Sequence, residues 1–152
     1  MINPPIVSYY EHGTYLTATH GHAAMFGTYG MLALGIMIFS LRSIVKPEAW
    51  NEKRINLSCK LLNIGLVLML VFNLLPVGFL QLKASFEQGT WFARSFDFIG
   101  SPIIQRLTWA RMIGDIIFLT GIALLLYEVA RMFFNLRKPV TVQPNNDVSL
   151  PS

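Results

Sequence analysis

The sequence predicts an all-α membrane protein with three transmembrane helices. Two observations lead to this fold class. The 152 residues are 53% hydrophobic and only 13% charged, whereas soluble domains carry about 25% charged residues. The apolar residues also gather in three runs, each close to the ~20 residues that an α-helix needs to cross the hydrocarbon core of a bilayer. This pattern excludes an ordinary soluble domain.

Each run can be read directly from the sequence. Ala23 to Leu41 is a stretch of 19 residues without charge, and Leu61 to Leu80 is a second of 20 residues. The third, Met112 to Val129, is interrupted by Asp115 and Glu128. Allowing for polar helix ends, we expect the spans at about residues 14–42, 58–82 and 106–131. Together they form one membrane region, residues 1–138. Residues 139–152 are polar and contain proline, so we expect a disordered tail there.

The basic residues predict the orientation of the three helices. Of the 12 Lys and Arg residues, eight lie in the connection 42–60 or in the segment 131–138, on one side of the predicted membrane. The other four lie on the opposite side or at its edge. The positive-inside rule places the richer side in the cytoplasm. We therefore expect a multi-pass protein of the inner, cytoplasmic membrane with a cytoplasmic C-terminus. Since these residues are spread between apolar runs, the formal charge of +4 does not indicate nucleic-acid binding.

Two histidines near the start of the first span are the main candidates for a functional site. An ionisable side chain within a membrane span is a functional hypothesis by default. His20 and His22 differ by two positions, which is about 200° around an α-helix. Their rings should leave opposite faces, so one metal ion could not easily bind both. Two separate cofactors, one on each face, are possible, and imidazole is a good ligand for haem iron.

Glycines along the first span suggest a close neighbour. Small residues allow a second helix, or a flat macrocycle, to approach the backbone. For most of these glycines, helix packing alone is the preferred interpretation. Gly21 is different because it lies between the two histidines, where two bulky cofactors would crowd the helix.

The third span contains an unusual pair of charges. Arg111 and Asp115 are four residues apart, so they can form an ion pair on one helix face. We favour a structural pair in the interior of the bundle. The alternative is that Arg111 binds a haem propionate, since arginine suits a carboxylate.

A longer motif surrounds the histidines, and it resembles a known family. The segment Tyr9 to Gly30, YYEHGTYLTATHGHAAMFGTYG, is similar to the tenth core helix of the haem–copper oxidase superfamily. Within it, the segment looks like the nitric oxide reductase branch and its quinol-dependent members. The later segments NIGLVLM, LPVGFLQ and WARMIGD support the same branch. The likeness covers residues 2–138, nearly the whole chain.

The resemblance implies a fold and a set of cofactors. The three helices would be equivalent to the last three core helices of the subunit I fold, in a C-terminal fragment or a split-gene product. His20 would be the proximal ligand of a high-spin haem iron, and His22 one axial ligand of a low-spin haem iron. The cofactors would be two b-type haems, with Arg111 as a further cofactor-binding residue. The complete enzyme would also hold a non-haem iron, whose ligands are absent from this chain.

The resemblance also implies an activity and partners. The family branch reduces nitric oxide to nitrous oxide, and the electron donor would be quinol or cytochrome c. The partners would be membrane lipid and the upstream helices of subunit I. No residue of this chain is assigned as catalytic, and we expect the chain alone to be inactive.

Two other functions remain open from the sequence. One is that the chain belongs to an oxygen-reducing terminal oxidase subunit I, because the residues that distinguish such oxidases lie outside this region. The other, from a different class, is a non-enzymatic membrane assembly protein whose histidines only pack within a bundle.

Overall fold

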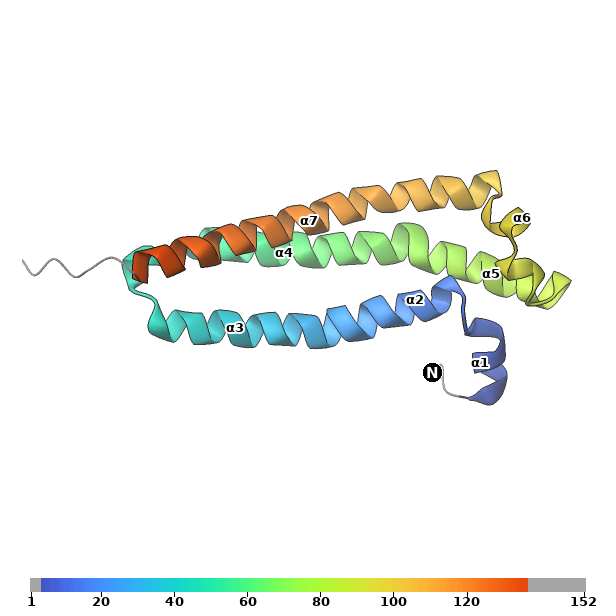
Figure 1. Cartoon of the computed structure of the whole chain (residues 1–152), viewed down its shortest axis with the longest axis horizontal. Coiled ribbons are helices and arrows are strands. Elements are labelled where there is room, and N and C mark those ends of the chain that lie inside the picture. The colour runs from blue at the N-terminus through green and yellow to red at the C-terminus, as the bar shows by residue number, and fades with distance from the viewer. Residues whose placement is uncertain (1–3, 137–152) are drawn as a thin grey trace, which may run out of the picture.

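The computed structural model describes residues 4–136, which form an elongated bundle of three long helical rods (Figure 1). Three helices are long and apolar enough to cross a membrane: Tyr15–Ile44, Glu52–Gln88 and Pro102–Phe134. The described residues contain no strand. The all-α membrane fold that the sequence predicts is therefore confirmed. The expected disordered tail, residues 139–152, lies outside the described part of the chain.

The first rod carries both histidines. It consists of α2 (Tyr15–Gly21), a π-helical segment (His22–Gly30) and α3 (Met31–Ile44). The helix begins after Thr14, whose side chain accepts a hydrogen bond from the backbone N–H of Leu16 at 3.3 Å. A threonine in this position satisfies one of the donors that a helix start leaves unpaired. A short helix, α1 (Pro5–Glu11), precedes the rod and lies across its end.

The second rod is interrupted by a π-helical turn. It runs through α4 (Glu52–Met69), the π-helical segment Leu70–Leu74 and α5 (Leu75–Gln88). The π-helical turn comes directly before Pro76, which has no N–H and whose ring would clash with a carbonyl of the preceding turn in a regular helix. The wider turn keeps the rod continuous there. The rod ends at Gly89, whose φ of 91° favours glycine.

The third rod is one continuous helix, α7 (Pro102–Leu136). Between the second and third rods lie a 3₁₀ turn (Phe92–Arg94) and the short helix α6 (Phe96–Ile99). Another 3₁₀ turn (Pro47–Ala49) lies between the first and second rods. We call the end of the bundle formed by residues 42–60 and 127–131 the basic end, and the end that holds α1, α5 and α6 the histidine end.

The rods are longer than the membrane spans expected from the sequence. The first connection is only residues 45–51, because α4 already begins at Glu52. Asn51 starts this helix by accepting a hydrogen bond from the N–H of Arg54 at 3.1 Å. The rods exceed the predicted spans because a charged residue ends an apolar run but does not end a helix. The backbone hydrogen bonds of the helix continue into the polar region.

Glycines bring the second and third rods into close contact. A Cβ atom added at Gly65 would lie 2.6 Å from the backbone N of Phe118. One added at Gly114 would lie 2.8 Å from the backbone N of Met69. Both distances are too short for real atoms, so the α4–α7 interface depends on glycine at these positions.

Glycines of the first rod have more space. A Cβ at Gly21 or at Gly35 would have no neighbouring atom within 4 Å, and one at Gly27 would touch the side chain of Leu66 at 3.3 Å. The glycines of the first rod itself therefore do not bring it into close contact with the other two. On the second rod, however, a Cβ at Gly78 would lie 2.8 Å from the side chain and 2.9 Å from the backbone N of Leu16, so the first rod packs closely on the second at the histidine end.

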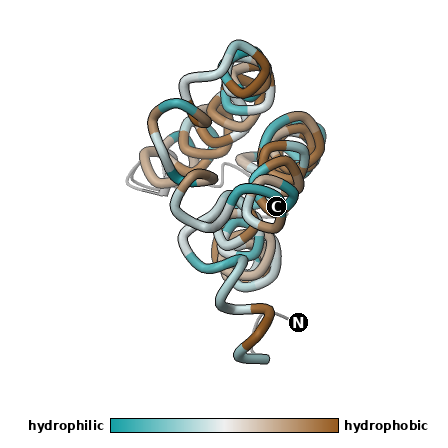
Figure 2. Tube along the Cα trace, turned by 90° about the vertical axis from the view of Figure 1, so that its right-hand side faces the viewer, coloured by the Kyte–Doolittle hydropathy of each residue, from teal (hydrophilic) through white to brown (hydrophobic). Residues whose placement is uncertain are grey.

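The three rods also differ in how much of their apolar surface is buried. Of the most apolar stretch of each rod, 44% of the second and 22% of the third are buried, but none of the first. Figure 2 looks along the rods and shows hydrophobic residues on all three of them. The first rod thus leaves most of its apolar surface open to lipid or to further helices.

Candidate functional site

A cleft of about 810 Å³ lies between the first rod and the other two, toward the histidine end. Its walls come from three helices that are far apart in the sequence. The lining residues are Ala18, Gly21, His22, Met25, Phe26, Leu66, Met69, Arg111, Asp115, Phe118 and Leu119. Most of them are apolar, which is typical of a site that buries a large ligand around a few polar groups.

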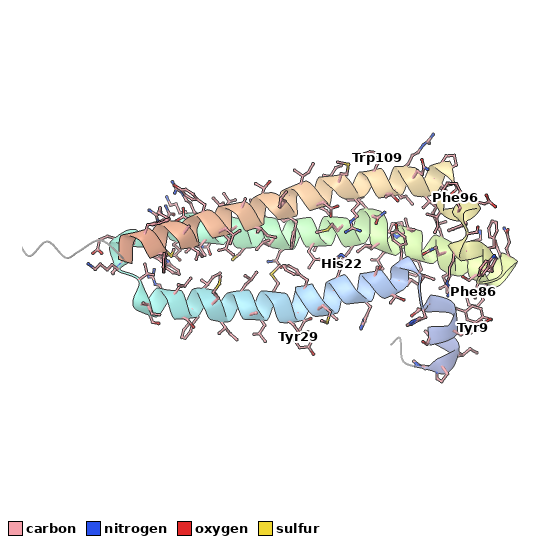
Figure 3. The ribbon with its side chains drawn as sticks, viewed as in Figure 1. Tyr9, His22, Tyr29, Phe86, Phe96 and Trp109 are labelled. Atoms are coloured by element: carbon pink, nitrogen blue, oxygen red, sulfur yellow. The ribbon has the colours of Figure 1, made fainter. Side chains whose placement is uncertain are left out.

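His22 lines this cleft, and its ring orientation is fixed. Figure 3 shows His22 on the side of the first rod that faces the second. Its Nδ1 lies 2.8 Å from the backbone carbonyl oxygen of Ala18. A carbonyl can only accept a hydrogen bond, so Nδ1 carries the proton. In the neutral ring, Nε2 then keeps its lone pair, which is the arrangement that metal-binding histidines use.

His20 is exposed and is not among the residues that line the cleft. The two histidines are therefore not brought together by the fold, in line with their spacing of two residues. Within residues 4–136, no three His, Cys, Asp or Glu side chains are grouped closely enough to hold a metal ion. Any metal bound here through His20 or His22 would need further ligands, as the iron of a haem does.

Arg111 and Asp115 lie in the wall of the cleft, on α7. The Nε atom of Arg111 is 3.2 Å from Oδ2 of Asp115 and 3.3 Å from Oδ1. The i, i+4 ion pair that the sequence suggests is thus present, but it does not lie in the interior of the bundle, because the side chains of Arg111 and Asp115 are 31% and 45% exposed. It also lines the same cleft as His22, so the two interpretations of Arg111 are compatible: the guanidinium is paired and still borders the space beside the imidazole.

Two phenylalanines contribute to the apolar part of the cleft. The rings of Phe26 and Phe118 meet edge to face, with centroids 4.8 Å apart and an angle of 70° between their planes. Such pairs add to the packing energy beyond the area they bury. They link the first rod to α7 and keep the inner part of the cleft apolar.

A hydrogen-bond network at the histidine end was not anticipated from the sequence. Gln81 is 2% exposed. Its Oε1 accepts a hydrogen bond from the N–H of Tyr15 at 2.7 Å, and its Nε2 donates to the carbonyl of Ala93 at 3.0 Å. Arg94 donates to the carbonyl of His12. The only signal in the sequence was a polar residue directly after the uncharged run Leu61–Leu80.

The cleft meets three requirements of a haem site. It offers an imidazole whose Nδ1 lies against the Ala18 carbonyl, which leaves Nε2 as the nitrogen that can bind iron. It is largely apolar, and no atom occupies the space beside Gly21. It also holds an arginine that suits a propionate carboxylate. The residues present therefore fit a haem with one axial ligand from His22.

Comparison with known proteins gives two matches. The family model described as cytochrome c and quinol oxidase polypeptide I matches residues 1–117. A nitric oxide reductase subunit from Stutzerimonas stutzeri is 29% identical over 126 residues, which is 80% of this chain and 26% of that protein. The chain thus spans about a quarter of the length of this relative. With the three membrane-spanning helices and the family match over most of its length, the chain belongs to the cytochrome c and quinol oxidase polypeptide I family, the subunit I of haem–copper oxidases.

Proposed function

We propose that this chain is the haem-binding C-terminal portion of a respiratory nitric oxide reductase, which reduces nitric oxide to nitrous oxide with electrons from quinol. The observation that carries the proposal is the cleft that His22, with its ring oriented by Ala18, lines together with the Arg111–Asp115 pair of α7. The similarity to a nitric oxide reductase subunit of Stutzerimonas stutzeri supports this branch of the family.

In this proposal, His22 is one axial ligand of a low-spin, b-type haem in the cleft. A bound haem would supply one-electron transfer. The hydrogen bond to the Ala18 carbonyl holds the imidazole in one tautomer and orientation. Arg111 binds a propionate, and Phe26 and Phe118 keep water from the apolar part of the cleft.

His20 is proposed as the proximal ligand of a second, high-spin b-type haem on the open face of the first rod. That face has no buried side chain along its most apolar stretch, which leaves room for a cofactor and for the upstream helices of subunit I. The non-haem iron of the complete enzyme would be held by those upstream helices. We also propose that the basic end, and with it the C-terminus, lies in the cytoplasm, because positive charge favours that side of the inner membrane.

The assignment of the two histidines is tested in the assembled enzyme. His22→Ala should remove the low-spin haem signal from the optical and EPR spectra. His20→Ala should preserve that signal and abolish nitric oxide consumption, because the high-spin iron loses its proximal ligand. If both variants lose the same spectral species, the assignment to two different haems is wrong. His12→Ala serves as a matched control, since His12 is exposed and does not line the cleft.

An oxygen-reducing terminal oxidase is the second candidate. The observation that favours it is the family model, whose description names oxidases rather than a reductase. Gas consumption by the purified enzyme with quinol or reduced cytochrome c distinguishes the two. Uptake of nitric oxide with stoichiometric nitrous oxide supports the reductase. Uptake of oxygen without nitric oxide turnover would favour the oxidase, and the preferred reductant identifies the donor.

A further inference from the structure

A second cleft, of about 370 Å³, lies at the basic end between α3 and the start of α4. Its lining includes the apolar residues Ile38, Phe39 and Ile55. Arg42, Trp50 and Asn56 also line it. Because Arg42 follows Phe39 by about one helical turn on α3, Arg42 lies nearer the end of the membrane span and Phe39 lies deeper.

Arg42 is held in place without a carboxylate partner. Its guanidinium lies over the ring of Trp50, 4.8 Å from the ring centroid, a favourable cation–π arrangement. Within the described residues, no ion pair joins Arg42 to an acidic side chain. Glu52 also lines the cleft, but it does not pair with Arg42. The positive charge of Arg42 is therefore available to a ligand.

The other two arginines nearby are used differently. Arg54 and Arg131 both bind the fully buried Glu128, at 2.8 Å and 2.9 Å. The basic end contains six Lys and Arg residues and three glutamates. One of these glutamates, Glu128, is buried and bound by Arg54 and Arg131. The remaining surface around the cleft carries a positive excess, which attracts anions.

We propose that this cleft binds an anionic phospholipid. The phosphate would be bound by Arg42 and by the side-chain amide of Asn56, and an acyl chain would lie against Ile38 and Phe39. Phe39 is 78% exposed and lies in the apolar part of the first rod, so its ring is open to contact with an acyl chain. Basic pockets between transmembrane helices are typical binding sites for anionic lipid head groups. This inference is independent of the haem assignment.

The test uses the protein purified from its membrane in a neutral detergent. Phosphatidylglycerol or phosphatidylcholine is added in equal amounts, and the lipid retained is measured by native mass spectrometry. We expect preferential retention of phosphatidylglycerol. Arg42→Gln should reduce that retention about fivefold, as expected for one cation at a membrane surface. Arg42→Lys should restore part of it. Lys53→Gln is the control, since Lys53 is exposed at the same end but does not line the cleft.

Three results would overturn the proposal. They are equal retention of the two lipids, equal losses in Arg42→Gln and Lys53→Gln, or full competition by inorganic phosphate, which would indicate an anion site without a lipid chain. A second measurement needs no variant. A photoactivatable phosphatidylglycerol should crosslink to residues 35–42 or 50–56 of the unmodified protein, and crosslinking only elsewhere would contradict the assignment.

Discussion

The side chain of Gln81 caps the first rod from the second, because its Oε1 accepts the N–H of Tyr15 at 2.7 Å. Tyr15 is the first residue of α2, which carries His20. A helix start leaves several N–H groups without a partner in the helix. The same glutamine donates to the carbonyl of Ala93. One buried side chain thus ties the start of the histidine-bearing helix to the connection between α5 and α6.

Gln81→Leu should destabilise the protein by about 1–3 kcal/mol, because it leaves the Tyr15 N–H and the Ala93 carbonyl without their partner. We also expect the amide hydrogen of Tyr15 to exchange faster in this variant than in the unmodified protein. Gln88→Leu, in the exposed last turn of α5, provides the control. If the exchange rate at Tyr15 is the same in Gln81→Leu and in the unmodified protein, the proposed capping role is incorrect.

Gly65→Ala should separate α4 from α7. The added Cβ would lie 2.6 Å from the backbone N of Phe118, and a backbone atom cannot turn aside as a side chain does. We expect a loss of about 1–3 kcal/mol, the usual cost of overpacking, measured as a lower midpoint of thermal unfolding in detergent. Gly35→Ala adds the same atom where no neighbour lies within 4 Å, so its midpoint should stay close to that of the unmodified protein. Equal effects of the two changes would contradict this account of the interface.

Glu128→Ala should destabilise the basic end by about 1–3 kcal/mol. It removes the shared partner of Arg54 and Arg131, and a broken charged hydrogen bond costs about this much when its partners can still reach water. Both arginines are partly exposed, at 46% and 31%, so the larger cost of a fully buried unpaired charge does not apply. Glu128→Gln keeps the shape and an acceptor oxygen and should cost less.

The control for Glu128 is Glu87→Ala, which removes an exposed i, i+4 partner of Lys83 at 3.8 Å. Surface ion pairs of this kind contribute little. Chemical denaturation measures the free energy of unfolding of Glu128→Ala, Glu128→Gln and Glu87→Ala. A loss in Glu128→Ala no greater than that in Glu87→Ala would show that the buried carboxylate does not hold the basic end together.

Arg111→Gln should lower the reduction potential of the haem that we propose in the cleft. Removing a nearby positive charge disfavours the added electron, by an amount on the order of tens of millivolts at the effective dielectric of a protein. Potentiometric titration of the low-spin band measures this shift, and Arg111→Lys, which keeps the charge, should shift it less. Arg106→Gln is the control, because Arg106 does not line the cleft. An equal shift of the reduction potential in Arg111→Gln and Arg106→Gln would contradict the placement of Arg111 beside the haem.

The sequence by itself determined the features that depend on local geometry. The lengths of the apolar runs predicted three membrane-spanning helices, and the structure contains them. The start of the first rod near Thr14 and the Arg111–Asp115 pair also follow from short spacings along one helix. In each case the interacting groups are at most four residues apart, so the period of the α-helix fixes their relation.

Only the tertiary structure decided which groups meet across helices. The sequence placed His20 and His22 on opposite faces but could not tell which ring faces the other rods. It offered no reason to join Gln81 to Tyr15, or Glu128 to Arg54, which are 66 and 74 residues apart. Such contacts depend on how each rod is rotated about its axis. That rotation is set by close packing at glycines such as Gly65, where the neighbouring backbone leaves no room for a side chain.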